Sequence, residues 1–127
     1  TSRDDAISML DAGEVEMTIG VPPTSTGRIL SVPLFEERFV GILRKDHPAI
    51  RQGLNLETFL SLTHLLVSPE NDRFGVVDTA LAKQGLKRQL ALTLPQLYAA
   101  PALVASSDMI ATIQRWFRER VIEVFSV

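Results

Sequence analysis

The sequence of 127 residues contains no cysteine and only two histidines. The absence of cysteine excludes a disulfide framework and a thiolate zinc site. His47 and His64 lie in different predicted elements and lack the close spacing of a metal-binding pair, so we expect no metal and no cofactor. We interpret His47, which precedes a proline, as a turn residue and His64 as a residue at a strand edge.

Long apolar runs and an excess of one charge are also missing. No segment approaches the ~18 apolar residues of a membrane span, and no charged-then-apolar leader opens the chain. The net charge is −2 with acids and bases interspersed, so no face is predicted to bind a phosphate backbone. These features predict a soluble, cytoplasmic chain that binds neither membrane nor DNA by itself, although a lack of cysteine does not exclude the periplasm.

The sequence has none of the common catalytic motifs. A GxSxG elbow, a P-loop and a GxGxxG fingerprint are all absent. Carboxylate pairs occur at residues 4–5 and 36–37, but adjacent side chains diverge on a strand and do not face each other on a helix. The Ser-Ser-Asp cluster at 106–108 has no neighbouring base that the sequence identifies. We therefore predict no catalytic residue and no enzyme.

The strongest periodicity lies in residues 75–113, which predict helix, strand, helix and strand in turn. Leu90, Leu92 and Leu94 alternate with smaller or polar residues, a pattern that places leucines on one face of a strand. Pro95 stands where this strand ends and the next helix begins, a position that suits its fixed φ. The stretch predicts an α/β unit.

Weaker patterns predict the remaining elements. A helix with Ser2 as its N-cap should end at Gly13, and Asn55 should cap a short helix. The segments at 21–27 and 45–53 are predicted loops because they are rich in turn residues. The other predicted strands are 15–19, 28–35, 38–44, 64–67 and 109–113, and the other predicted helices are 55–62, 75–84 and 116–124.

Ligands bind open α/β sheets beyond the carboxyl ends of the strands, where helix N-termini present free N–H groups. Two such corners are predicted here, at Phe74–Gly75 and at Pro95–Gln96. We therefore expect a crevice that binds a small, anionic organic effector. The predicted effector-binding residues, with the two on the hinge side first, are Gly20, Val21, Ser68, Arg73, Phe74, Gly75, Pro95, Gln96 and Leu97.

The residue types at these corners fit a carboxylate attached to an organic body. The Ser68 hydroxyl and the Arg73 guanidinium would complement the helix N–H groups, while Phe74 and Leu97 would form an apolar wall. Core packing explains Phe74 and Leu97 equally well, and a solvated loop charge explains Arg73 equally well. Ser68 and Gln96 favour a binding role because they are polar residues at a strand end and a helix end.

Four segments together resemble a known family. LDAGEVEMTIG at 10–20, LFEERFVGILRKDHP at 34–48, HLLVS…GVVDTALAKQGLKRQLALTLP at 64–95 and ASSDMIATI at 105–113 resemble the effector-binding domain of LysR-type transcriptional regulators. The resemblance is greatest to the NodD-like and NahR-like branch, many members of which sense aromatic acids or related small molecules. Two positions depart from the family, which usually has Asp at Glu16 and Pro at Gln114.

The resemblance implies a periplasmic-binding-protein-like (type 2) fold of two α/β lobes joined by two crossovers. Residues 22–104 would form a complete second lobe, and residues 1–21 and 105–127 would be parts of the first. The hinges would lie near Val21 and Ser106. The winged helix-turn-helix that binds DNA in the family would be absent from this chain.

The implied function is that of the ligand-sensing domain of a bacterial transcription factor. A small-molecule effector would bind between the lobes, and DNA would be a partner only through the missing N-terminal domain. A stand-alone periplasmic solute-binding protein is the alternative, because it would share the two-lobed crevice. A helix-turn-helix encoded upstream would favour the regulator, and a secretory leader would favour the alternative.

The resemblance also implies a homodimer or tetramer. In the family, a first-lobe helix of one protomer meets the second lobe of its partner across a two-fold axis. These surfaces would correspond here to residues 4–12 and 76–83. We expect Met9 and Val76 to lie in the interface, whereas Leu10 and Leu81 should pack into their own lobes.

Overall fold

The computed structural model describes residues 3–21, 27–70, 72–122, 124–125 and 127. The chain forms two compact units, Thr1–Glu36 and Glu37–Val127, which we call unit 1 and unit 2 and describe separately. The predicted N-cap Ser2 and most of the predicted loop at 21–27 lie outside the described residues.

Unit 1 contains one helix, α1 (Arg3–Asp11), and otherwise irregular backbone among its described residues. Gly13 follows the helix with a φ of 73°, a left-handed conformation that glycine adopts without strain, so the predicted helix end is confirmed. The strands predicted at 15–19 and 28–35 are wrong. A strand needs a hydrogen-bonded neighbour and a face to bury, and both segments are largely exposed and unpaired in the structure.

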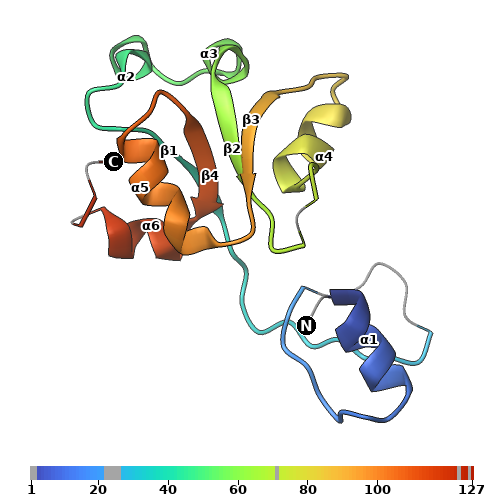
Figure 1. The fold of residues 1–127 in the computed structure, drawn as a ribbon. Coiled ribbons are helices and arrows are strands. Elements are labelled where there is room, and N and C mark those ends of the chain that lie inside the picture. The colour runs from blue at the N-terminus through green and yellow to red at the C-terminus, as the bar shows by residue number, and fades with distance from the viewer. Residues whose placement is uncertain (1–2, 22–26, 71, 123, 126) are drawn as a thin grey trace. The chain divides into compact units, whose positions relative to one another are not determined.

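Unit 2 is built on a four-stranded sheet of order β1-β4-β2-β3 (Figure 1). Strand β2 (Thr63–Val67) pairs in parallel with both β3 (Gln89–Leu94) and β4 (Ile110–Gln114). Strand β1 (Phe39–Ile42) lies antiparallel to β4. The strands predicted in these four places are confirmed, although β1 is shorter than expected.

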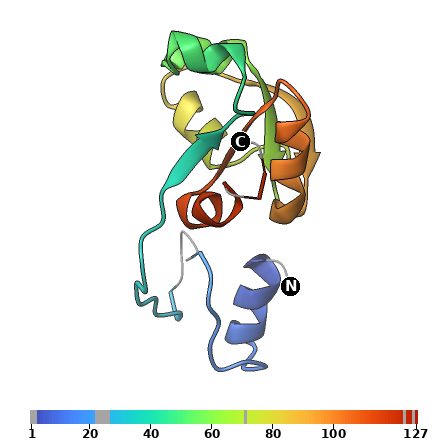
Figure 2. The ribbon, with the colours of Figure 1, turned by 90° about the vertical axis from the view of Figure 1, so that its left-hand side faces the viewer.

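Helices cover both faces of this sheet. Figure 2 shows the sheet between α4 (Val76–Ala82) and α5 (Ala100–Ala105). Adjacent residues of β2 point to opposite faces: Leu65 packs in a core with α5, whereas the Leu66 side chain lies beside Gly75, the N-cap of α4. A 3₁₀ turn, η1 (Leu97–Ala99), precedes α5, and α6 (Arg115–Val121) follows β4.

The hydrophobic core of unit 2 lies on the α5 side of the sheet. Leu65, Ala111 and Ile113 extend from the central strands towards Val104 of α5 and Phe117 of α6. These side chains are all fully or almost fully buried. Burial on this scale is the main force that holds a small α/β unit together.

Two short helices precede β2, namely α2 (Pro48–Gln52) and α3 (Leu56–Ser61). Asn55 caps α3 as predicted, since its Oδ1 accepts a hydrogen bond from the Thr58 N–H at 2.8 Å. The segment containing α2 was predicted as a loop. The helix forms because His47 Nδ1 accepts from the Ala49 N–H at 3.0 Å and Pro48 suits the first helical position.

The predicted division into two lobes, 22–104 and 1–21 with 105–127, stays a prediction. Strand β4 pairs with β1 and β2, so it lies in the same unit as the residues predicted to form the second lobe. The segment at Ser106 is a short connection between α5 and β4 inside unit 2, where a crossover between lobes was expected.

Candidate functional site

The ends of all four strands meet at one edge of the sheet of unit 2. Because β2, β3 and β4 run in parallel, their carboxyl ends at Val67, Leu94 and Gln114 lie at the same edge. The antiparallel β1 begins there, with Phe39 opposite Gln114. We call the described residues that leave or enter the strands here, 38–39, 68–70, 72–75, 95–98 and 114–116, the carboxyl edge.

Backbone hydrogen bonds extend the strand pairing into this edge. The Ser68 N–H donates to the Leu94 carbonyl at 2.7 Å, which places Ser68 next to Pro95. The Arg115 N–H donates to the Arg38 carbonyl at 2.8 Å. Parallel pairing of β2 and β3 therefore brings Ser68 next to the second predicted corner, Pro95–Gln96.

Ser68 is buried directly after β2, and its Oγ accepts a hydrogen bond from the Asp72 N–H at 3.0 Å. Its hydroxyl proton has no acceptor among the residues that the structure describes. Arg73 and Phe74, in the same loop, are exposed. Exposure argues against the core interpretation of Phe74 and leaves both side chains accessible to a ligand.

Gly75, the last residue of this loop, is tightly packed against the sheet. A Cβ added there would lie 2.9 Å from Leu66 Cδ1, so the backbone approaches the sheet more closely than other residues allow. The Gly75 N–H donates to Asp78 Oδ2 at 2.8 Å. The expectation of a free N–H at Gly75 is therefore wrong, because a side chain of the same helix already binds it.

Asp78 is itself held by a buried arginine that precedes β3. Arg88 Nε and Nη2 donate to the two Asp78 carboxylate oxygens at 2.8 and 2.7 Å. Burial raises the pKa of Asp78, but the hydrogen bonds from Arg88 and Gly75 outweigh it and hold the pKa below its usual value. This bidentate pair fixes the start of α4 against the sheet.

His64 lies in the central strand β2 and is fully buried, so its predicted place at a strand edge is wrong. Its Nε2 lies 2.7 Å from the Phe59 carbonyl and must therefore carry the proton. Burial lowers the pKa of His64, and the positive charge of Arg88 lowers it further. His64 therefore acts as a neutral structural residue.

At the second corner Pro95 and Gln96 are exposed, whereas Leu97 is half-buried and packs against the core. Part of the Leu97 side chain therefore packs against the core, as one of its two interpretations predicted. Gln96 makes no side-chain hydrogen bond at the start of η1. Its amide is thus free to bind a ligand beside Ser68.

The remaining predicted residues, Gly20 and Val21, lie in unit 1 and are exposed. Their part in the site stays a prediction. Among the residues of the carboxyl edge that were not predicted for the site are two aromatic residues, Tyr98 in η1 and Trp116 in the first turn of α6. Their positions, within four residues after a predicted strand end, were the only signal in the sequence.

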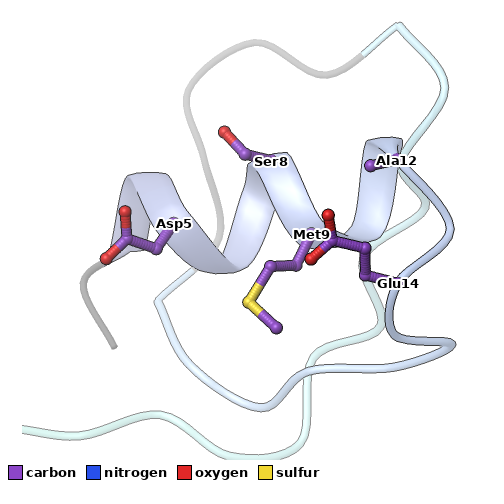
Figure 3. A pocket seen from close by; sticks show the side chains of 5 residues that line it. All are labelled: Asp5, Ser8, Met9, Ala12 and Glu14. Atoms are coloured by element: carbon purple, nitrogen blue, oxygen red, sulfur yellow. The ribbon is translucent and has the colours of Figure 1, made fainter.

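A separate hollow lies along α1 in unit 1 (Figure 3). Its volume is about 460 Å³, and it is lined by Asp5, Ser8, Met9, Ala12 and Glu14. It contains none of the predicted site residues. The hollow is open and has two carboxylates in its lining, so it suits an anionic ligand less well than the carboxyl edge does.

Other kinds of site find no support in the described part of the chain. No group of three or more potential metal ligands occurs among the residues that the structure describes. No helix there has the length and apolar character that crossing a bilayer requires.

The mixed α/β sheet of unit 2 is consistent with the periplasmic-binding-protein-like (type 2) fold. Residues 1–124 match the family model of the LysR substrate binding domain. The chain therefore belongs to the LysR substrate-binding domain family. The predicted fold class and family are both confirmed.

Known relatives agree with this assignment. The chain is 32% identical to the HTH-type transcriptional activator NagR of Ralstonia sp. over 87% of its length, covering 37% of that protein. It is 29% identical to the HTH-type transcriptional activator NahR of Pseudomonas putida over its whole length, covering 43% of that protein. The chain thus spans about two-fifths of the length of these curated relatives.

Solved structures show the same fold. The probable transcriptional regulator PA0477 from Pseudomonas aeruginosa superposes with a TM-score of 0.84 and 31% identity, over 94% of this chain and 40% of that one. The regulatory domain of the transcriptional activator MexT from the same organism gives a TM-score of 0.54 and 32% identity, over 72% of this chain and 47% of that one.

Proposed function

We propose that the chain is the sensor of a cytoplasmic LysR-type transcription factor and has no catalytic activity of its own. A small organic anion would bind at the carboxyl edge of unit 2 and change how the intact protein controls transcription. The observation that carries this proposal is the Ser68–Leu94 hydrogen bond, because it places the polar Ser68 at the end of β2 next to the exposed Pro95 and Gln96 at the end of β3. DNA would be contacted by a segment outside this chain, as the names of NagR and NahR suggest.

The chemistry of the edge supports an anionic ligand. The Ser68 hydroxyl proton, the Gln96 amide and the Arg73 guanidinium are all donors that the protein leaves available. A carboxylate accepts several such hydrogen bonds at once, and those from a guanidinium are charge-assisted. The family match favours this sensor over the alternative of a stand-alone solute-binding protein.

A ligand can change the protein only through its different affinity for two conformations. In the proposed mechanism, effector bound at the carboxyl edge stabilises one arrangement of the two lobes of the intact domain. Small-angle scattering of the intact protein should then change modestly when effector is added at saturation. Identical scattering curves would contradict lobe closure as the response.

A thermal-shift screen of aromatic and aliphatic carboxylic acids on the intact protein tests the site. Ser68→Ala and Gln96→Ala should each reduce the stabilisation that a binding acid gives, because each removes a donor. Ser61→Ala and Gln52→Ala are matched controls, since they lie on α3 and α2, away from the carboxyl edge. Unchanged shifts in both site variants would place the pocket elsewhere.

Self-association is a second part of the proposal. Val76 is exposed on α4, as an interface residue should be, whereas Leu81 is buried in its own unit. Met9 is half-buried on α1. Sedimentation of the intact protein should show an oligomer that Val76→Glu and Met9→Glu weaken, while Val124→Glu, at another exposed valine, leaves it intact. A monomeric wild type at tens of micromolar would overturn it.

A further inference from the structure

The two faces of the sheet in unit 2 differ in polarity. The face towards α5 is the apolar core, which contains Leu65 of β2 and Ala111 and Ile113 of β4. Side chains alternate along a strand, so His64 and Thr112, which are next to these residues in sequence, point to the other face, where α4 lies (Figure 2). His64 is fully buried there. This face therefore encloses polar side chains in the interior of the unit.

Three buried side-chain atoms have no hydrogen-bond partner among the residues that the structure describes. They are Nδ1 of His64, Nη1 of Arg88 and Oγ1 of Thr112. His64 is 0% exposed and the Arg88 side chain 1%, so bulk solvent does not reach the two nitrogen atoms. Buried polar atoms are almost always hydrogen-bonded to protein or to an enclosed water, because an unsatisfied one is strongly unfavourable. Both nitrogen atoms therefore need a partner inside the protein.

The Arg88 side chain extends past His64 towards α4. Its backbone directly precedes β3, at the level where β2 begins. Its Nη2 lies 4.0 Å from the point that a Cβ of Gly75 would occupy, and Leu66 Cδ1 lies 2.9 Å from the same point. The side chain therefore reaches the level of Leu66, and His64 lies between these two levels on the same face. Burial lowers the pKa of His64, and the nearby positive charge of Arg88 lowers it further, in agreement with this placement.

The two unpartnered nitrogen atoms differ in their hydrogen-bonding character. Nη1 of Arg88 can only donate, because the guanidinium is always charged and has no lone pair to offer. His64 Nε2 carries the proton of the ring and donates it to the Phe59 carbonyl, so Nδ1 can only accept. A molecule that binds both atoms must accept from Nη1 and donate to Nδ1. A simple anion cannot donate, and a metal cation would be repelled by the guanidinium, whereas water fits both requirements.

We propose that the α4 side of the sheet holds a buried water site, in which one water accepts a hydrogen bond from Arg88 Nη1 and donates one to His64 Nδ1. Two protein partners lie within the range of about two to four that buried waters bind. Arg88 also binds Asp78 of α4, and His64 also binds the Phe59 carbonyl of α3. The water thus joins these pairs into one hydrogen-bonded network. The site is separate from the proposed effector site and does not depend on it.

Nuclear magnetic resonance of the intact protein tests the site through the imidazole nitrogen atoms. An imine nitrogen that accepts a hydrogen bond resonates upfield of one that does not. His47 supplies an internal reference, because its Nδ1 accepts from the Ala49 N–H at 3.0 Å. At about pH 8, where imidazole is ordinarily neutral, we expect the His64 Nδ1 shift to fall close to that of His47. His64 Hε1 should also show a nuclear Overhauser effect from a long-lived water, and His64→Gln identifies both signals by removing them.

The double variant Arg88→Met/Asp78→Leu removes the donor Nη1 without leaving a buried charge. In this variant we expect the His64 Nδ1 resonance to move downfield and the Overhauser effect from water to be lost. Arg28→Met is the matched control, because it removes an arginine whose side chain is 78% exposed and should leave both His64 signals unchanged. If the double variant does not fold, the two signals of the wild type still decide the test.

Several outcomes would overturn the proposal. A His64 Nδ1 resonance well downfield of that of His47, or no Overhauser effect from water, would show that no water bridges the two side chains. A scalar coupling between His64 Nδ1 and an Arg88 N–H would show a direct hydrogen bond instead. In crystals grown with bromide, an anomalous peak beside Arg88 Nη1 would identify an anion site. The screen of carboxylic acids tests the effector site independently of these measurements.

Discussion

Both units of the molecule contain close arginine–aspartate ion pairs, and one pair from each unit shows how their surroundings differ. Arg28 and Asp11 of unit 1 approach to 2.6 Å, with side chains 78% and 51% exposed. Arg88 and Asp78 of unit 2 approach to 2.7 Å, with side chains 1% and 10% exposed. Almost equal distances therefore describe two different interactions, because water screens the first pair and protein surrounds the second.

The apolar residues of the two units show the same contrast. No described residue of unit 1 is buried, and Leu30, Val32 and Phe35 are among its largely exposed side chains. Unit 2 buries a continuous core between its sheet and two helices. Apolar residues thus stabilise a segment only where other elements cover them. The stability of this chain should accordingly reside in unit 2.

The largest expected difference between the units comes from truncating one phenylalanine in each. Phe117→Ala should lower the free energy of unfolding by about 3–5 kcal/mol, because it opens a cavity in the core. Phe35→Ala should change it by less than about 0.5 kcal/mol, since the ring is exposed. Urea unfolding followed by circular dichroism measures both. Comparable losses would mean that unit 1 also has a stabilising core.

Breaking the two ion pairs sharpens the same comparison. Arg88→Met should destabilise the protein by about 3 kcal/mol, because it leaves the Asp78 carboxylate buried without its partner. Arg28→Met should cost only about 0–1 kcal/mol. The double variant Arg88→Met/Asp78→Leu should recover most of the loss, as no buried charge remains. If the double variant is as unstable as Arg88→Met, the loss of stability comes from altered packing and not from the unpaired charge.

Removing a helix cap should have a smaller effect. Asn55→Ala should cost about 1 kcal/mol, since the Thr58 N–H loses its acceptor, whereas Asn55→Gly should cost only a few tenths. The same denaturation experiment measures both variants. An equal cost for alanine and glycine would assign the effect of Asn55 to something other than capping.

The smallest expected effect is a dependence of stability on pH. The pKa of His64 is lowered in the folded protein by burial, so below about pH 6.5 the unfolded chain binds a proton that the folded chain does not. Stability should therefore fall as pH decreases from 7 towards 5. His64→Gln keeps a donor for the Phe59 carbonyl but cannot titrate, so it should flatten this fall. An unchanged slope would assign the pH dependence to other groups.

The fold of unit 2 was largely predictable from the sequence, and that of unit 1 was not. The alternation of Leu90, Leu92 and Leu94 became a strand because β2 supplies a parallel partner. Val15, Met17 and their neighbours alternate just as regularly, yet no described strand pairs with them. Periodicity predicts which face would be buried, and only the tertiary structure decides whether burial occurs.

The candidate site was also predictable only in part, because its residues depend on how the strands and helices pack. Ser68 and Gln96 were expected because polar residues follow two strands, and parallel pairing brings their segments together. Tyr98 and Trp116 were missed, because their shared contact with Phe117 depends on how η1 and α6 pack after the sheet has formed. The engagement of the Gly75 N–H by Asp78 also depends on local side-chain geometry that a sequence pattern does not show.

Hydrogen–deuterium exchange of the intact protein, with and without the acid that binds most tightly, tests the site most directly. We predict slower exchange in peptides that cover residues 66–75, 94–98 and 114–118, because a ligand at the carboxyl edge stabilises the backbone there. Peptides from the opposite end of unit 2, covering α2 and α3, should be unaffected. Protection confined to residues 5–14, which line the hollow of unit 1, would contradict the proposed site.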